Sequence, residues 1–255
     1  MGETTNPFKA RGAEISPFGG IDSSAGTDDH AGLSPPGRSP VSDELTLRQD
    51  LATQGAKLAA SGLSQGTSGN LSARCGDGFL ITPSGTPYED ITAEGIVFVD
   101  AEGRWAASQR PSSEWRFHRD IYLARPDAEA IVHVHPPYAT ALAMCRKDIP
   151  PAHYMIAVGG GDSIRCASYH TYGTQALSDA VVAALEGRLA CLMANHGMIA
   201  LGSSLAQAMW RAVEVENLAR QYALALQIGT PVMLTEDEVT AVLEKFANYG
   251  LMSRS

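Results

Sequence analysis

The sequence is poor in positive charge and in long apolar runs. Its 19 Lys and Arg residues are outnumbered by 28 Asp and Glu residues, which gives a formal net charge of −9 over 255 residues. This balance offers no field for the phosphate backbone of a nucleic acid or for an anionic membrane surface, so we expect neither as a partner. No segment reaches the roughly 18–20 apolar residues of a membrane span, and the first residues do not resemble a secretion signal. We therefore expect a cytoplasmic protein.

Cysteine is also scarce, and its spacing excludes two kinds of site. Cys75, Cys145, Cys166 and Cys191 form no C-x-x-C pair, and a chain of this length does not depend on disulfides for its core. We expect all four to be reduced, mostly buried thiols. With 44% hydrophobic and 18% charged residues, the composition is that of a packed globular domain, and no internal repeat is present.

The chain divides near residue 40. Residues 1–40 are rich in Gly, Pro, Ser and Thr and show no apolar periodicity, which predicts a disordered N-terminal tail. An alternative is that this segment covers a neighbouring subunit. Residues 41–255 show the periodic apolar pattern of one folded domain.

Helical and extended patterns alternate along that domain. Apolar spacing and capping residues predict helices over residues 45–62, 113–124, 136–145, 174–185, 204–228 and from 235 onward. Short apolar runs bounded by turn residues predict strands over 70–74, 78–82, 96–100, 130–135, 189–193 and 198–201. At the first helix we expect Ser42 as the N-cap and Gly62 as the end. Strands mixed with helices in this way predict a three-layer α/β/α domain.

Three histidines indicate a metal site. His133 and His135 lie in a predicted strand, where the two-residue period directs both imidazoles to one face. Two histidines in a strand are also compatible with a polar face or a buried pair. His196 lies in an Asn-His-Gly turn between two apolar runs and offers a third imidazole. Three histidines with an open fourth position are typical of a catalytic zinc site.

Polar residues of three further segments complete the pattern. Glu114 follows Ser112 and Ser113 at a predicted helix N-terminus, where the serines alone could explain the segment as a cap. Residues 66–70 and 82–85 are predicted turns that are rich in hydroxyl groups and glycine. Their backbone N–H groups could bind an anion, or the segments could be ordinary turns without a ligand. A metal, a carboxylate base and an anion cradle in one place would suit a particular kind of substrate. That substrate carries a phosphate and has an acidic C–H beside a carbonyl.

The same segments resemble the class II aldolase/adducin family from about residue 45 to the C-terminus. The matching segments, in order, are residues 66–70, 80–85, 111–118, 133–135, 149–150 with 153–156, 195–197, and 243–246 with 249–250. The resemblance implies an α/β/α fold around a mostly antiparallel mixed sheet. It also implies metal-dependent cleavage of a ketose 1-phosphate into dihydroxyacetone phosphate and an aldehyde, in a homotetramer with sites at the subunit interfaces.

The resemblance assigns a role to individual residues. His133, His135, His196 and Glu114 would bind Zn²⁺, with Mn²⁺ and Co²⁺ as other candidates, and Glu114 would leave the metal to act as the base. Tyr154 would act across a subunit interface, and Tyr249 would close over the substrate. The family's phosphate-binding positions correspond to Thr67, Asn70, Ser84, Gly85, Ser112 and Ser113.

Other reactions on the same fold stay open at this point. A metal-dependent decarboxylase of a hydroxylated aromatic acid would need the same metal but no phosphate. A pentulose-phosphate 4-epimerase is a second alternative, although that branch has Asp at the position of Glu114. The adducin branch is non-catalytic and lacks the metal ligands. His118 is interpreted as a partner of Glu114 or as a buried core residue, and His170 as a residue near the mouth of the site.

Overall fold

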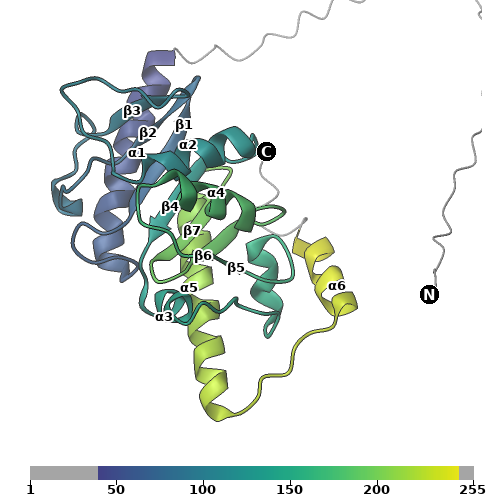
Figure 1. The fold of residues 1–255 in the computed structure, drawn as a ribbon. Helices are drawn as coiled ribbons and strands as arrows, with labels where there is room; N and C mark the ends of the chain where they lie inside the picture. Colours follow the sequence, from purple (N-terminus) through teal and green to yellow (C-terminus); the bar gives the residue numbers. More distant parts are fainter. Residues whose placement is uncertain (1–39, 247–255) are drawn as a thin grey trace, which may run out of the picture. The chain divides into compact units, whose positions relative to one another are not determined.

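The computed structural model describes residues 40–246. The predicted N-terminal tail, apart from its last residue, and Tyr249 lie outside the described residues. A seven-stranded sheet lies between two layers of helices, which confirms the predicted three-layer α/β/α domain (Figure 1). Within residues 40–246, no helix combines the length and the apolar composition that crossing a bilayer requires.

The sheet is mixed and mostly antiparallel, as the family resemblance implies. Its strands, in the spatial order β3-β2-β1-β4-β7-β6-β5, pair antiparallel except for the parallel pair of β5 and β6. In chain order they are β1 (Asn70–Cys75), β2 (Gly78–Ile81), β3 (Val97–Asp100), β4 (Ala130–Val134), β5 (Arg165–Ala167), β6 (Ala190–Met193) and β7 (Gly197–Gly202). The short edge strand β5 is absent from the sequence prediction.

Within the described residues, six α-helices and two 3-10 helices precede, connect and follow these strands. The α-helices are α1 (Pro40–Ser61), α2 (Trp115–Ala124), α3 (Pro137–Met144), α4 (Gln175–Ala184), α5 (Leu205–Ile228) and α6 (Glu236–Phe246). The 3-10 helices are η1 (Tyr88–Asp90) and η2 (Tyr154–Gly159).

Each face of the sheet carries its own apolar core. Along β4, Val132 packs with α1, α3 and α5, whereas Ile131 packs with α2 and α4 on the opposite face. The same alternation along β7 places Ala200 in the first core and Ile199 in the second. The two-residue period of the strands therefore separates the helix layers, and it places His133 on the α2 side, with its ring against Phe117 at 5.4 Å.

Helix ends follow local chemistry, with two corrections. α6 begins at the predicted capping box, in which Thr235 Oγ1 accepts from the Glu238 N–H and Glu238 Oε2 accepts from the Thr235 N–H. α1 starts at Pro40, so Ser42 lies inside the helix and is not its N-cap. The N-cap of α2 is Glu114 itself, so neither preceding serine caps that helix.

All four cysteines are free, but the expectation that most are buried is wrong. Cys191 on the central strand β6 is buried, whereas Cys75 and Cys166 are only half-buried. Cys145 is exposed because it follows the last turn of α3 at the surface.

Candidate metal centre and active site

The sheet brings three histidines together where β4 and β6 end and β7 begins. His133 lies on β4, His135 follows the end of that strand, and His196 lies in the turn between β6 and β7. The three ring centroids are 4.8 to 4.9 Å apart, and one nitrogen from each ring lies within 4.8 Å of the others. The two-residue spacing, the β4–β7 pairing and the turn thus produce a set of ligands that fits one metal ion.

The turn that carries His196 depends on its neighbours. Asn195 has a φ of 55°, a left-handed conformation that asparagine tolerates better than most residues. Gly197 leaves room for the His135 ring, because a Cβ there would meet His135 Cδ2 at 2.5 Å and the Val134 carbonyl oxygen at 2.6 Å. The Asn-His-Gly turn therefore orients the imidazole of His196 and leaves space for the imidazole of His135.

Hydrogen bonding fixes which nitrogen of His133 faces the cluster. Its Nδ1 donates to the Met198 carbonyl at 3.0 Å, so Nε2 carries a lone pair. That lone pair lies 3.0 Å from His135 Nε2 and 3.1 Å from Glu114 Oε2. A lone pair facing a carboxylate oxygen is unfavourable unless a proton or a cation lies between them.

Glu114 brings a second carboxylate oxygen to the cluster. Oε1 is buried without a hydrogen-bond partner, and it lies 3.1 Å from His196 Nε2. Burial raises the pKa of Glu114, but its interactions with His133 and His196 lower it more, so its pKa lies below the usual range. Burial, with smaller contributions from the other two imidazoles, lowers the pKa of His135 to about 3, which favours its neutral, metal-binding form. An anionic carboxylate and three imidazoles are a donor set that fits a divalent cation.

A small polar cavity of about 190 Å³ opens beside this cluster. Each of the six predicted phosphate-binding residues lines it, together with Glu114, His135 and His196. Its complete lining is Thr67, Ser68, Gly69, Asn70, Pro83, Ser84, Gly85, Ser112, Ser113, Glu114, His135, Tyr172 and His196. Three segments that are far apart in the sequence therefore meet the metal cluster in one place.

Asn70 links the cradle to the carboxylate. Its Nδ2 donates at 2.9 Å both to Ser112 Oγ and to Glu114 Oε2. Its Oδ1 bonds to His118 Nε2, so His118 is both a buried residue and, through Asn70, a partner of Glu114. Burial, with a smaller electrostatic contribution from His133, lowers the pKa of His118 to about 3, so that ring is neutral.

Tyr154 and the loop that carries His170 and Tyr172 lie differently with respect to the cavity. Tyr154 is 54% exposed and does not line the cavity of its own chain. Tyr172 does line it, although the sequence analysis selected His170 from the same segment. His170 bonds to Ser168 at 3.3 Å and is not among the lining residues. An aromatic residue in a loop carries no periodic signal, so the sequence alone gave no reason to select Tyr172.

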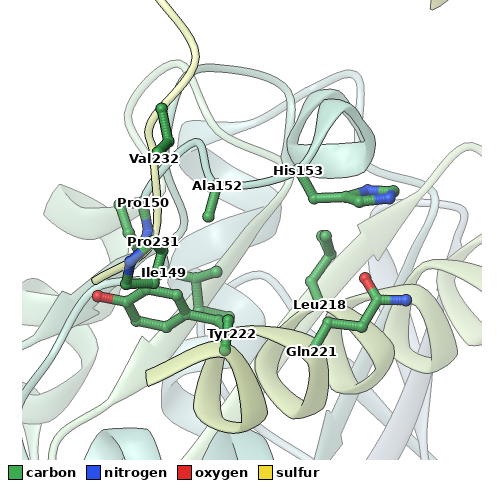
Figure 2. A pocket seen from close by; sticks show the side chains of 10 residues that line it. Ile149, Pro150, Ala152, His153, Leu218, Gln221, Tyr222, Pro231 and Val232 are labelled. Atoms are coloured by element: carbon green, nitrogen blue, oxygen red, sulfur yellow. The ribbon is translucent and has the colours of Figure 1, made fainter. Parts of the chain in front are cut away.

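A second, larger cavity of about 350 Å³ lies elsewhere, against the C-terminal half of α5 (Figure 2). Leu218 and Tyr222 line it from α5, and Pro231 and Val232 from the segment that follows. His153 points across it, but no member of the metal cluster lines it. The larger cavity is mainly apolar, so we place the chemistry in the smaller, polar one.

Comparison with known proteins matches this arrangement to a family. Residues 49–223 match the profile of the class II aldolase and adducin N-terminal domain. The chain belongs to this family. It is 52% identical over 206 residues to the 5-methylthioribulose-1-phosphate/5-deoxyribulose-1-phosphate aldolase of Rhodospirillum rubrum, over 81% of this chain and 93% of that protein. It is 51% identical over 196 residues to the L-fuculose phosphate aldolase of Escherichia coli K12, over 76% of this chain and 91% of that protein.

A solved structure of this class II aldolase family agrees. The structure of an L-fuculose 1-phosphate aldolase superimposes with a TM-score of 0.76 at 43% identity, over 79% of this chain and 96% of the other. The chain is therefore a lyase of the class II aldolase type, and it carries the three-histidine site of a metal-dependent enzyme.

Proposed function

We propose that this class II aldolase cleaves a ketose 1-phosphate into dihydroxyacetone phosphate and an aldehyde. The observation that carries the proposal is the shared cavity, in which the hydroxyl-rich cradle lies against Glu114 and two of the three histidines of the cluster, His135 and His196. Both curated relatives described above are named as aldolases of sugar phosphates. A substrate with a phosphate beside its reacting carbons spans these two halves of the cavity.

We assign the phosphate to the six cradle residues. None of the residues that line the cavity is Lys or Arg, so the dianion would be bound by hydrogen bonds from hydroxyl and backbone N–H groups. Thr67 and Ser84 are exposed, and Ser113 lies just before the N-terminus of α2, whose dipole favours an anion. This directed binding agrees with a chain whose overall charge is negative.

We assign a divalent ion, Zn²⁺ first among the candidates, to His133, His135 and His196, with Glu114 as a further ligand before substrate binds. When bound, the ion supplies Lewis acidity that stabilises the negative charge developing on the substrate oxygens. Glu114 would hold and move the proton at the carbon beside the carbonyl, accepting it in the synthetic direction and returning it in cleavage. Its two oxygens each lie 3.1 Å from an imidazole nitrogen of the cluster, so the base would lie beside a substrate bound at the metal.

We further propose a homotetramer in which Tyr154 of one subunit serves the cavity of its neighbour. Tyr154 is exposed and absent from its own cavity, as a residue acting in trans must be. Exposed apolar residues Ile228 and Val232, 89% and 88% accessible, offer additional surface for a subunit contact. Tyr154 would exchange the proton of the aldehyde oxygen, and Tyr249 would close the site.

The test of the function is a product analysis. Purified metal-loaded enzyme is incubated separately with L-fuculose 1-phosphate, with 5-methylthioribulose 1-phosphate and with a dihydroxyphthalate, and triose phosphate and CO₂ are measured. Triose phosphate from either sugar supports the proposal, and the better of the two sugars identifies the aldehyde. Release of CO₂ alone would identify a decarboxylase, and a new pentulose phosphate without triose phosphate would identify an epimerase. Either result would refute the proposal.

A further inference from the structure

Four buried polar side chains form a row between β1 and α2, behind the cavity. Asn70 and Ser72 lie two residues apart on β1, and His118 and Tyr122 lie four residues apart on α2. Their exposed fractions are between 0 and 5%. Two residues of strand span about 6.6 Å and four residues of helix about 6 Å, so the two pairs can stay in register across the layer boundary.

A continuous series of hydrogen bonds joins these side chains. Tyr122 Oη and Ser72 Oγ are 2.8 Å apart, and Ser72 Oγ and His118 Nδ1 are 2.7 Å apart. His118 Nε2 bonds to Asn70 Oδ1, and Asn70 Nδ2 donates to Glu114 Oε2. The row therefore ends on the carboxylate that we propose as the base.

The direction of every bond in the row is determined. Asn70 Nδ2 donates to Glu114, so its Oδ1 must accept, and His118 Nε2 must carry the ring proton. His118 Nδ1 is then an acceptor, which takes the Ser72 hydroxyl proton. Ser72 Oγ in turn accepts from the Tyr122 hydroxyl. Reversing any one bond would leave a buried donor or acceptor unpaired, which is costly.

The outer end of the row is held in place. Arg74 Nη2 donates to the Tyr122 carbonyl oxygen at 3.0 Å, and its guanidinium carbon lies 4.8 Å from the centroid of the Tyr122 ring. His118 is further confined by the Phe117 ring, with centroids 4.8 Å apart. These contacts hold Tyr122 and the His118 ring in place.

We propose that Tyr122, Ser72 and His118 are positioning residues that fix the amide orientation of Asn70 and, through it, the carboxylate of Glu114. The inference rests on the proposed function, because it takes Glu114 as the base. If the amide turned over, Asn70 Oδ1 would face the carboxylate and repel it, and the base would lose its only hydrogen bond from an amide side chain among residues 40–246. The row thus holds Glu114, the proposed base, in position for proton transfer before the substrate binds.

The experiment isolates proton transfer from bond cleavage. Dihydroxyacetone phosphate is incubated in D₂O with full-length metal-loaded enzyme and no aldehyde, and exchange of its C–H proton is followed by NMR. We expect Ser72→Ala to reduce the exchange rate by about tenfold, with its metal content unchanged. The metal content is expected to stay the same because Ser72 is not part of the metal cluster and does not line the cavity.

Ser178→Ala is the matched control. Ser178 is as fully buried as Ser72, and its hydroxyl donates at 2.6 Å to Asp120, which lies on the same helix as His118. Normal exchange in Ser178→Ala beside reduced exchange in Ser72→Ala supports the proposal. Equal losses in both variants, or exchange by Ser72→Ala within about twofold of wild type, would overturn it.

A second pair of variants tests the same point at His118. The glutamine amide nitrogen lies where His Nε2 lies and can still donate to Asn70, whereas the asparagine nitrogen reaches only the position of Nδ1. We expect His118→Gln to exchange faster than His118→Asn, and equal rates would overturn the proposal. If His118→Asn does not fold, the serine pair decides. Absence of exchange in wild type would instead refute the proposed function itself.

Discussion

A single methyl group at Gly197 should disturb the metal centre. Gly197 does not have a positive φ, so its backbone accepts alanine, and the effect of Gly197→Ala is purely steric. The new Cβ would meet His135 Cδ2 at 2.5 Å, well inside the 3.4 Å at which ordinary contact begins. The new Cβ would also meet the carbonyl oxygen of Val134, which pairs with Met198 of β7, so both the imidazole and the strand backbone must shift by nearly 1 Å.

The expected loss follows from that displacement. We expect a fall in zinc affinity of about 10- to 100-fold, the range seen when a ligand loses its support, and destabilisation by about 1–3 kcal/mol from overpacking. Zinc affinity is measured against a competing chelator, and stability by urea unfolding of the metal-free protein. Gly229→Ala is the control, because a Cβ there meets nothing within 4 Å. Zinc affinity of Gly197→Ala within about twofold of wild type would refute the packing argument.

Three further predictions concern the base, the subunit contact and pH. Glu114→Gln should lower turnover by about 10²- to 10⁴-fold while the protein still binds metal, and normal kinetics would refute its role as the base. In the proposed homotetramer, assemblies mixed from inactive Glu114→Gln and Tyr154→Phe subunits should regain activity, because a hybrid interface can pair an intact Glu114 with an intact Tyr154. No recovery would place Tyr154 in its own subunit's site. Burial is the main reason why the pKa of His118 is about 3 in the folded protein, compared with 6.5 in the unfolded chain. Between pH 6.5 and pH 3 the imidazole is therefore protonated only in the unfolded chain. The free energy of unfolding falls as the pH is lowered through this range. From pH 7 to pH 4 we expect metal-free wild type to lose about 3 kcal/mol more unfolding free energy than His118→Gln in urea titrations, and parallel pH curves would contradict this.

Much of the fold was predictable because its signals are local. A few adjacent residues are enough to predict β4 and β7 from their apolar runs and the start of α6 from its capping box. The sequence did not predict β5 because this strand has only three residues. It pairs in parallel with β6 at the sheet edge, and no local sequence pattern indicates that pairing. The start of α1 was placed too late because a serine before an apolar run is a common but not a necessary N-cap.

The candidate site was predictable as a set of residues but not as a set of contacts. The spacing of His133 and His135 indicates a shared face, but only the pairing of β4 with β7 brings His196 to them. The bond from Asn70 to Glu114 depends on how β1 packs against α2, and the need for glycine at 197 depends on the ring of His135. These are tertiary contacts, which spacing in one sequence does not encode.

Titration of the metal-free protein with Zn²⁺ tests the central claim most directly. Cleavage of the preferred sugar phosphate is followed as zinc is added to chelator-treated wild type and to His133→Ala. We expect activity to rise from zero and to saturate at about one ion per chain in wild type, and to stay near zero in the variant at the same zinc concentrations. Full activity without metal, or equal zinc binding by His133→Ala, would contradict the account.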